Sequence, residues 1–131
     1  MKDKTIDYVL RTTWLAVQRM YNEEASKFEA TMTTAFTLLS IDPQKGTPST
    51  ALGPKMGIEA TSLSRILKTL EKRELIVRRP NPEDGRGVLI NLTPKGSEKR
   101  EDSRQRVFTF NSSFLHKSFR VLKNFFTVNE F

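Results

Sequence analysis

The segment of residues 60–73 constrains the fold most strongly, because its two sides differ in chemistry. Its apolar side chains recur at intervals of three and four residues, the spacing of one helical stripe: Leu63, Ile66, Leu67 and Leu70. At about 100° per residue, the opposite stripe holds Thr61, Arg65, Lys68 and Lys72, flanked by Ser62, Ser64 and Thr69. We therefore expect a helix with one buried face and one cationic, hydrogen-bonding face. A merely solvated charged face is the alternative interpretation.

The residues before this helix predict the first half of a helix-turn-helix. Residues 48–56 are expected to form a short helix, and Gly57 follows it directly. A glycine-containing turn between two helices sets them at a steep angle in this motif. Thr47 is the expected N-terminal cap of the short helix, because it precedes a proline at the first helical position.

The residues after the helix predict a β-wing. Residues 75–79 and 88–92 have the composition of strands, and the loop between them is rich in turn formers. Arg86 lies in this loop between Gly85 and Gly87, whose freedom in backbone angles lets the loop turn tightly. The two helices and the hairpin together predict a winged helix-turn-helix over residues 47–96.

The end of the wing carries a signature that resembles a known family. Asp84 and Arg86 match an Asp-x-Arg wing motif, and Leu92, Thr93 and Gly96 match the Leu-Thr-x-x-Gly that follows it in the MarR family of bacterial transcription regulators. The resemblance implies a homodimer whose recognition helices enter successive major grooves of DNA, while each wing arginine probes a minor groove. It also implies a palindromic operator and a repressor that a small aromatic effector relieves.

One position departs from the family pattern. Glu74 stands where most relatives have a glycine before the leucine that starts the first wing strand. A left-handed backbone at Glu74 would cost roughly 1 kcal/mol of strain.

The resemblance and the helix pattern together assign expected roles to individual residues. Residues at the start of the recognition helix are expected to contact base edges: Thr61, Ser62, Ser64 and Arg65. Basic residues around them are expected to contact phosphates: Lys55, Lys68, Lys72, Arg78 and Arg79. In the wing, Asp84 is expected to accept the guanidinium of Arg86 and hold it extended toward the minor groove. A simple hairpin turn with a surface arginine is the alternative for the wing.

The two ends of the chain predict a dimer. Apolar spacing indicates a long amphipathic helix over residues 5–28 and a shorter one over 31–40, and Thr93-Pro94 has the form of a helix start. Seven of the nine phenylalanines lie between Phe108 and Phe131, more apolar surface than one terminal segment can bury by itself. We expect a mainly α-helical fold with a small β-wing, in which residues 1–46 supply helices for dimerisation and the core and residues 97–131 form a C-terminal dimerisation region. A plain N-terminal helix packed on the core of its own chain is the alternative for the first helix.

An effector pocket is the least defined of the expected sites. Trp14, Tyr21 and Phe36 are the candidate aromatic residues, and ordinary core packing is the alternative for Trp14 and Tyr21. The family resemblance implies a ligand wedged between the DNA-binding lobe and the helical dimer region. No residue pattern identifies that ligand.

Composition narrows the classes of function. The net charge is +7, and residues 55–79 hold seven basic residues against three acidic ones, which favours a polyanionic partner. With no cysteine, a single histidine and no phosphate-cradling loop, we expect no catalytic residues, metal site or cofactor. No apolar run approaches the ~20 residues of a membrane span, so we expect a cytoplasmic protein without a membrane partner.

Two hypotheses remain open at this point. The first is a sequence-specific regulator that binds double-stranded DNA as a dimer. The alternative is a winged helix that acts as a protein-interaction module without DNA binding, because a fold alone does not confer a function. A docking surface for protein would be expected to show apolar anchors on the helix and the wing.

Overall fold

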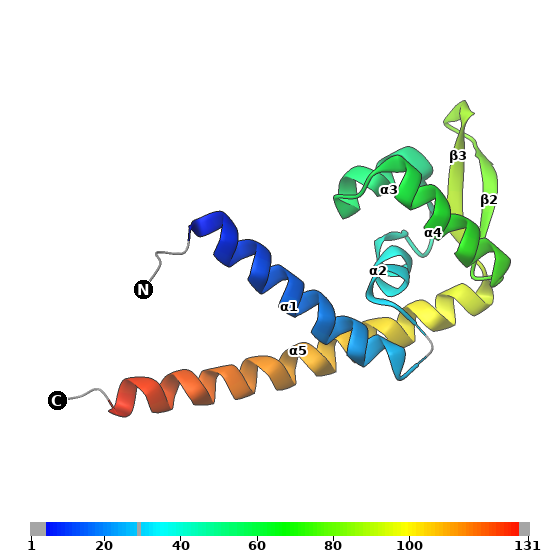
Figure 1. Ribbon diagram of the computed structural model, residues 1–131. Coiled ribbons are helices and arrows are strands. Elements are labelled where there is room, and N and C mark those ends of the chain that lie inside the picture. The colour runs from blue at the N-terminus through cyan, green and yellow to red at the C-terminus, as the bar shows by residue number, and fades with distance from the viewer. Residues whose placement is uncertain (1–4, 29, 129–131) are drawn as a thin grey trace.

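The computed structural model describes residues 5–28 and 30–128, with side chains up to His116. It is mainly helical with one small antiparallel sheet, as the sequence predicts (Figure 1). The helices are α1 (Ile6–Ser26), α2 (Met32–Ser40), α3 (Ser49–Met56), α4 (Ala60–Lys72) and α5 (Pro94–Val128). The strands are β1 (Thr47–Pro48), β2 (Ile76–Asn81) and β3 (Asp84–Leu92).

The hydrophobic core lies inside the winged lobe, which comprises α2, α3, α4 and the sheet. Buried apolar side chains come from each of these elements and from the connections between them: Leu38, Ile41, Leu52, Leu63, Leu67, Leu70, Leu75, Ile76 and Ile90. Three of them form the apolar stripe of α4, so the helical period expected for this segment is the one that the fold uses. This stripe packs α4 onto the core, and the opposite side of the helix is exposed.

The sheet contains a strand that the sequence did not predict. The strand order is β1-β3-β2, and Thr47 and Pro48 pair antiparallel with Ile90 and Leu89. The expectation that Thr47 caps α3 is therefore wrong. Thr47 lies within β1, its Oγ1 accepts a hydrogen bond from the Asp42 amide at 2.9 Å, and Pro48 occupies the cap position of α3 instead.

A capping threonine and a left-handed glycine define the turns between the helices. Thr31 caps α2, because its Oγ1 accepts from the Thr34 amide while the Thr34 hydroxyl accepts from the Thr31 amide. Gly57 ends α3 in a left-handed conformation with φ of 66°, the turn that the sequence predicts between α3 and α4. Pro54 is accommodated in the last turn of α3 without ending it earlier.

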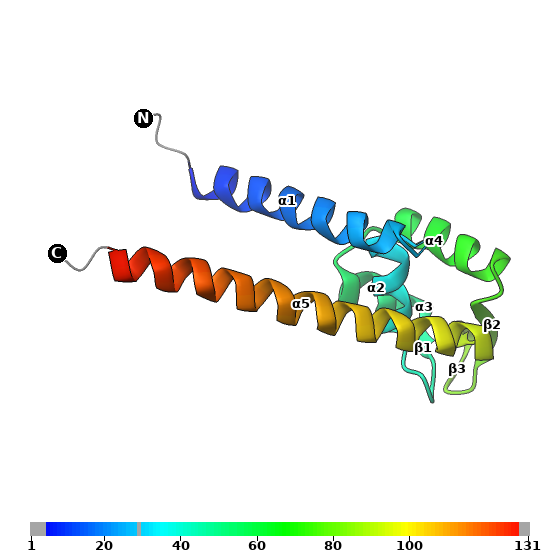
Figure 2. The same ribbon diagram turned by 90° about the horizontal axis from the view of Figure 1, so that it is seen from below.

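The long helices α1 and α5 extend away from the winged lobe. Both views place the start of α1 and the end of α5 on the side opposite the wing (Figures 1 and 2). Where the two helices meet, the Tyr21 ring packs 5.2 Å from the ring of Phe110, and the Tyr21 hydroxyl donates a hydrogen bond to Asn111 Oδ1. No residue of α1 is buried. Within the described part of the chain, no helix combines the length and apolar character needed to cross a membrane.

Candidate nucleic-acid interface

The outer face of α4 presents the residues that the sequence singled out for base contacts. Thr61, Ser62, Ser64 and Arg65 are all exposed, whereas Leu67, on the inner face, is 2% exposed. Small hydroxyl groups next to an arginine can donate and accept hydrogen bonds at base edges. The geometry therefore leaves this set of polar groups available to an external partner.

The predicted phosphate-contacting side chains next to the base-contacting set lie on two elements, α4 and β2. Lys68 and Lys72 are exposed on the same helix, and neither forms an ion pair with a side chain that the structure describes. Arg78, on β2, lies 3.2 Å from Glu71 through its Nε, so part of its charge is compensated within the lobe. Arg79 is its exposed neighbour on β2. Lys68 and Lys72 thus lie on the hydroxyl-bearing helix itself, and Arg78 contacts this helix through Glu71, as expected of phosphate-contacting residues.

Lys55 is placed differently from the other predicted phosphate contacts. Its Nζ donates a hydrogen bond of 2.7 Å to the Ser40 carbonyl at the end of α2, and Arg100 Nη2 lies 3.5 Å from the carbonyl of Leu39 in the same turn. Cations at the C-terminal end of a helix satisfy carbonyls that have no intrahelical partner. We therefore do not retain Lys55 among the phosphate contacts, because its ammonium group caps α2.

The wing tip is exposed from Pro82 to Arg86. Asp84 Oδ1 accepts a hydrogen bond from the backbone amide of Arg86 at 3.1 Å, and Asn81 Oδ1 likewise accepts from the Glu83 amide at 3.0 Å. The carboxylate of Asp84 thus shapes the loop backbone. The expected contact from the Arg86 guanidinium to Asp84 does not form, so the expected way of holding the arginine is wrong, although the side chain is exposed at the tip.

Glu74, which stands where most relatives have glycine, adopts the left-handed conformation that this position at the end of α4 requires. Glu74 has φ of 60°, and among the described residues it is the only non-glycine with a positive φ. Its amide donates to the Glu71 carbonyl and the Leu75 amide to the Leu70 carbonyl, each at 2.9 Å. This pair of bonds is the Schellman arrangement at a helix end, in which glycine usually occupies the left-handed position.

A cavity of about 790 Å³ lies between the winged lobe and the long helices. It brings together Trp14, Tyr21 and Phe36, the three candidate pocket residues, from α1 and α2. Its volume is in the range of small-molecule sites. The guanidinium carbon of Arg106 lies 3.1 Å from the centre of the Phe28 ring on its wall. The sequence did not point to these last two residues, because they come together only in three dimensions.

Two helices joined by a left-handed glycine turn and followed by a two-stranded wing define a winged helix-turn-helix protein. The sequence profile of the MarR family matches residues 30–88. The chain is 34% identical over 88 residues to the multiple antibiotic resistance protein MarR of Salmonella typhimurium, an alignment that covers 67% of this chain and 61% of that protein. The chain belongs to the MarR family.

Further comparisons agree with this assignment. The uncharacterized HTH-type transcriptional regulator YdgJ of Bacillus subtilis is 36% identical over 64 residues, 49% of this chain and 39% of that protein. The chain thus spans less than two thirds of the length of these two curated relatives. A cysteine-to-serine mutant of MarR from E. coli, solved with operator DNA, superposes with a TM-score of 0.74 at 25% identity, covering 91% of this chain and 89% of that one. The S. aureus MepR–DNA complex gives 0.75 at 17% identity, covering 97% and 100%.

Proposed function

We propose that this protein is a transcription regulator that binds a palindromic site in double-stranded DNA as a homodimer and acts as a repressor. The observation that carries the proposal is the outer face of α4, where every side chain expected to contact base edges is exposed together with Lys68 and Lys72. Between Ala60 and Leu70 this helix has no acidic residue. Such a face suits the floor and rim of a major groove.

The proposed roles divide the interface between specificity and affinity. Thr61, Ser62, Ser64 and Arg65 contact base edges, which distinguish all four base pairs in the major groove. Four cations contact phosphates and add affinity without sequence information: Lys68, Lys72, Arg78 and Arg79. Arg78 exchanges its contact with Glu71 for a phosphate as the protein docks. Arg86 enters the minor groove, on a loop that Asp84 shapes.

Exposed apolar side chains support the homodimer. The large hydrophobic residues with the greatest exposure lie on the long helices and not on the winged lobe: Ile6, Leu10, Phe108 and Leu115. Apolar surface concentrated on a projecting part of a chain is typical of an interface. A two-fold pair of such helices would place two winged lobes side by side, and two lobes require two half-sites about one helical turn apart.

The same observation argues against the protein-interaction alternative. Throughout residues 47–96, which the structure describes completely, no large hydrophobic side chain is exposed. A protein-docking surface on α4 or the wing would offer apolar or aromatic anchors there. The winged region offers cations and hydroxyl groups instead.

The cavity supports regulation by a small aromatic effector. Aromatic side chains from α1 and α2 line it together with residues of α5. Among the described lining residues, Lys55 alone belongs to the winged region 47–96, and its Nζ holds the end of α2. A ligand that displaces this contact would change how α3 sits on α2, and with it the placement of α4.

The first experiment recovers bound sites from random duplex DNA and then titrates the recovered site by fluorescence anisotropy. We expect an inverted repeat, and we expect affinity to fall by about 0.9 log units per log salt for each phosphate contacted. Arg86→Ala should weaken binding by about 1–3 kcal/mol. The matched control is Arg104→Ala, which removes the same side chain from an exposed position of α5.

The outcomes separate the hypotheses. Equal effects of the two arginine variants would remove the wing from the mechanism. No binding to any duplex at low ionic strength would overturn the proposal and leave the protein-interaction alternative. Recovery of sites without an inverted repeat would contradict the two-fold dimer.

The second experiment tests the effector with the only tryptophan of the chain, Trp14. Small aromatic compounds are titrated while Trp14 emission and operator affinity are followed. We expect a saturable change in emission and weaker operator binding at the same concentrations, and Phe36→Ala should reduce both. Emission that responds while operator affinity stays constant would separate the cavity from regulation.

A further inference from the structure

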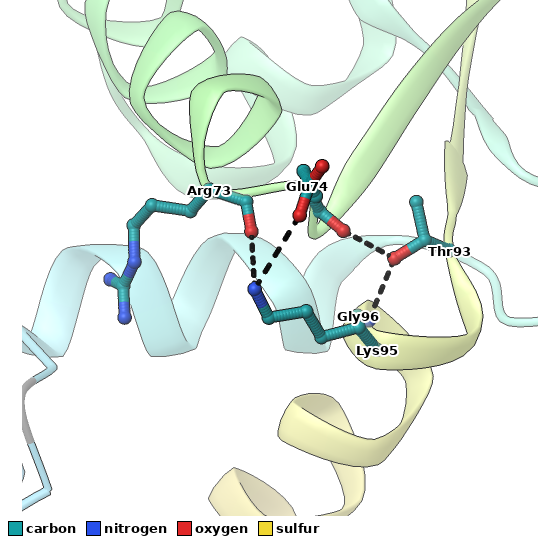
Figure 3. A network of polar contacts seen from close by, with 5 residues as sticks. All are labelled: Arg73, Glu74, Thr93, Lys95 and Gly96. Atoms are coloured by element: carbon teal, nitrogen blue, oxygen red, sulfur yellow. Dashed lines mark hydrogen bonds and ion pairs between the residues drawn. The ribbon is translucent and has the colours of Figure 1, made fainter.

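The C-terminal end of the recognition helix α4 meets the N-terminal end of the long helix α5 directly. The left-handed Glu74 turns the chain out of α4. The last carbonyls of a helix, here those of Arg73 and Glu74, accept hydrogen bonds from outside it. Figure 3 shows that the first residues of α5 approach these carbonyls from the other side. The two helix ends are therefore in a position to bond to each other's backbone groups.

One hydroxyl group links the two helices. Thr93 Oγ1 donates a hydrogen bond of 2.6 Å to the Glu74 carbonyl and accepts one of 2.9 Å from the Gly96 amide (Figure 3). The second bond is the N-terminal cap of α5, so a single side chain both caps α5 and holds the peptide that ends α4. The Thr93 amide adds a third bond, of 3.1 Å, to the Leu75 carbonyl.

We call this contact between the end of α4 and the start of α5, centred on Glu74 and Thr93, the joint. Two neighbouring residues strengthen it. Lys95 Nζ donates to the Arg73 carbonyl at 3.0 Å and lies 3.9 Å from Glu74 Oε2. Gly96 is buried, and a Cβ built on it would lie only 1.8 Å from the Leu75 carbonyl oxygen. The first turn of α5 thus rests directly on the backbone that leaves α4, and no side chain fits between them.

We propose that Thr93 is a positioning residue for DNA recognition, because its hydroxyl fixes the orientation of α4 relative to α5. This inference rests on the proposed function. α5 carries exposed apolar residues of the proposed dimer face, such as Phe108 and Leu115, whereas α4 carries the base-contacting face. The joint therefore determines how far apart the two recognition helices lie in the dimer.

A loosened joint would weaken mainly the binding of the second recognition helix to its half-site. Once one recognition helix is bound, the other binds its half-site as an intramolecular event, with an effective concentration that depends on how well it is already placed. A loose joint spreads the second helix over many orientations, and ordering it again costs free energy. Binding to an isolated half-site does not bear this cost.

The test compares Thr93→Val with two matched variants. Thr93→Ser keeps the hydroxyl and should restore wild-type behaviour. Thr37→Val removes a hydroxyl of the same lobe that bonds to the Thr33 carbonyl at 2.8 Å within α2, so it controls for loss of a hydrogen bond elsewhere. Each protein is titrated with the full operator, with a single half-site in DNA of equal length, and with an operator lengthened by one base pair between its half-sites.

We expect Thr93→Val to lose about tenfold in affinity for the full operator while its half-site affinity stays within about twofold, since only the bivalent gain is affected. It should also discriminate less against the lengthened operator. Thr37→Val should keep the wild-type ratio of full-site to half-site affinity. An equal loss on full site and half-site, or the same pattern in Thr37→Val, would overturn the positioning role.

A measurement without DNA separates this inference from the proposed function. The chain has no cysteine, so cysteines introduced at the exposed Thr69 of α4 and Gln105 of α5 allow a distance distribution to be measured between two spin labels. Labelled protein is diluted into an excess of unlabelled protein so that distances are within one chain. Thr93→Val should broaden the distribution, and Thr93→Ser and Thr37→Val should not.

The two failures are then distinct. If the wild-type protein binds no duplex, the proposed function fails whatever the label distances are, and the role in DNA recognition fails with it. If the wild-type protein binds its operator but Thr93→Val leaves both the distance distribution and the full-site to half-site ratio unchanged, only the positioning role is wrong.

Discussion

The winged lobe and the two long helices bury their apolar residues in different ways. Among the side chains that the structure describes, all nine core hydrophobic residues come from the stretch between Leu38 and Ile90, and several are completely buried. The long helices are also rich in apolar residues, yet Ile6 is 80% exposed and Phe108 is 61% exposed. The lobe closes its core with its own chain, whereas the long helices present an apolar surface outward.

In the proposed homodimer, this difference indicates where the second chain contributes. Burial of apolar surface is the main favourable term in folding, and a helix without a buried face is marginal on its own. α1 has no buried residue in a single chain. We infer that the lobe is stable within one subunit, while α1 and the part of α5 that extends beyond the lobe gain their stability from the proposed dimerisation. Substitutions in the two regions should therefore differ in how their effects depend on protein concentration.

The largest effect is expected in the core of the lobe. Leu70 is completely buried on α4, and Leu70→Ala should lower the free energy of unfolding by about 2–5 kcal/mol because it removes packed methyl groups and leaves a cavity. The measurement is urea denaturation followed by circular dichroism at two protein concentrations. The loss should be the same at both. A loss that grew on dilution would mean that the lobe, too, depends on the second subunit.

A charge on α1 should separate the subunits without unfolding the lobe. Leu10 is 66% exposed in the single chain, and Leu10→Asp should weaken the dimer by about 2 kcal/mol or more if this residue is central to the interface. Sedimentation equilibrium measures the dimer dissociation constant. The control is Thr12→Asp, which places the same charge about half a helical turn away on α1. An unchanged dimer in the Leu10 variant would exclude this face of α1 from the interface.

A smaller and opposite effect is expected at the joint between the two regions. Glu74→Gly should stabilise the protein by roughly 1 kcal/mol, because glycine adopts the left-handed conformation at Glu74 without steric cost. The ion pair with Lys95, at 3.9 Å between exposed side chains, contributes little. Differential scanning calorimetry should show a higher Tm. Glu74→Gln retains the Cβ and should give no gain, so equal gains in both variants would contradict relief of strain.

The residues of the joint also show which features can be predicted from sequence. The two helices, the glycine turn and the wing follow from local periodicity and turn chemistry, and a left-handed Glu74 follows from its place at a helix end. β1 could not be found in this way, because its two residues form a strand only by pairing with Ile90 and Leu89, far along the chain.

Side-chain partners were harder to predict than positions. The exposed face of α4 was predicted residue by residue, since helical phase alone determines it. Charge and sequence distance predict a phosphate contact for Lys55 and a contact with the Arg86 guanidinium for Asp84, yet Lys55 caps α2 and Asp84 binds a backbone amide. A flexible side chain can reach several partners, and the fold decides among them. The link through Thr93 likewise depends on two helix ends that are 19 residues apart in sequence.

The smallest expected effect lies on α5 between the two regions. Arg104 and Gln105 donate hydrogen bonds to the Glu101 carboxylate, and these contacts lower its pKa from 4.5 to about 2. Because the pKa is lower in the folded protein, the stabilisation is present above pH 4.5 and is lost as the pH falls toward 2. The group is exposed, so solvent and salt screen the interaction and its share of stability is small. Carboxyl carbon shifts in an NMR pH titration should show the lowered pKa, and Arg104→Met should raise it. A Glu101 pKa that stayed low in that variant would assign the shift to Gln105 instead. In either case the contact is within one helical segment of one chain, so the titration should be the same in the dimer and in the dissociated Leu10→Asp protein.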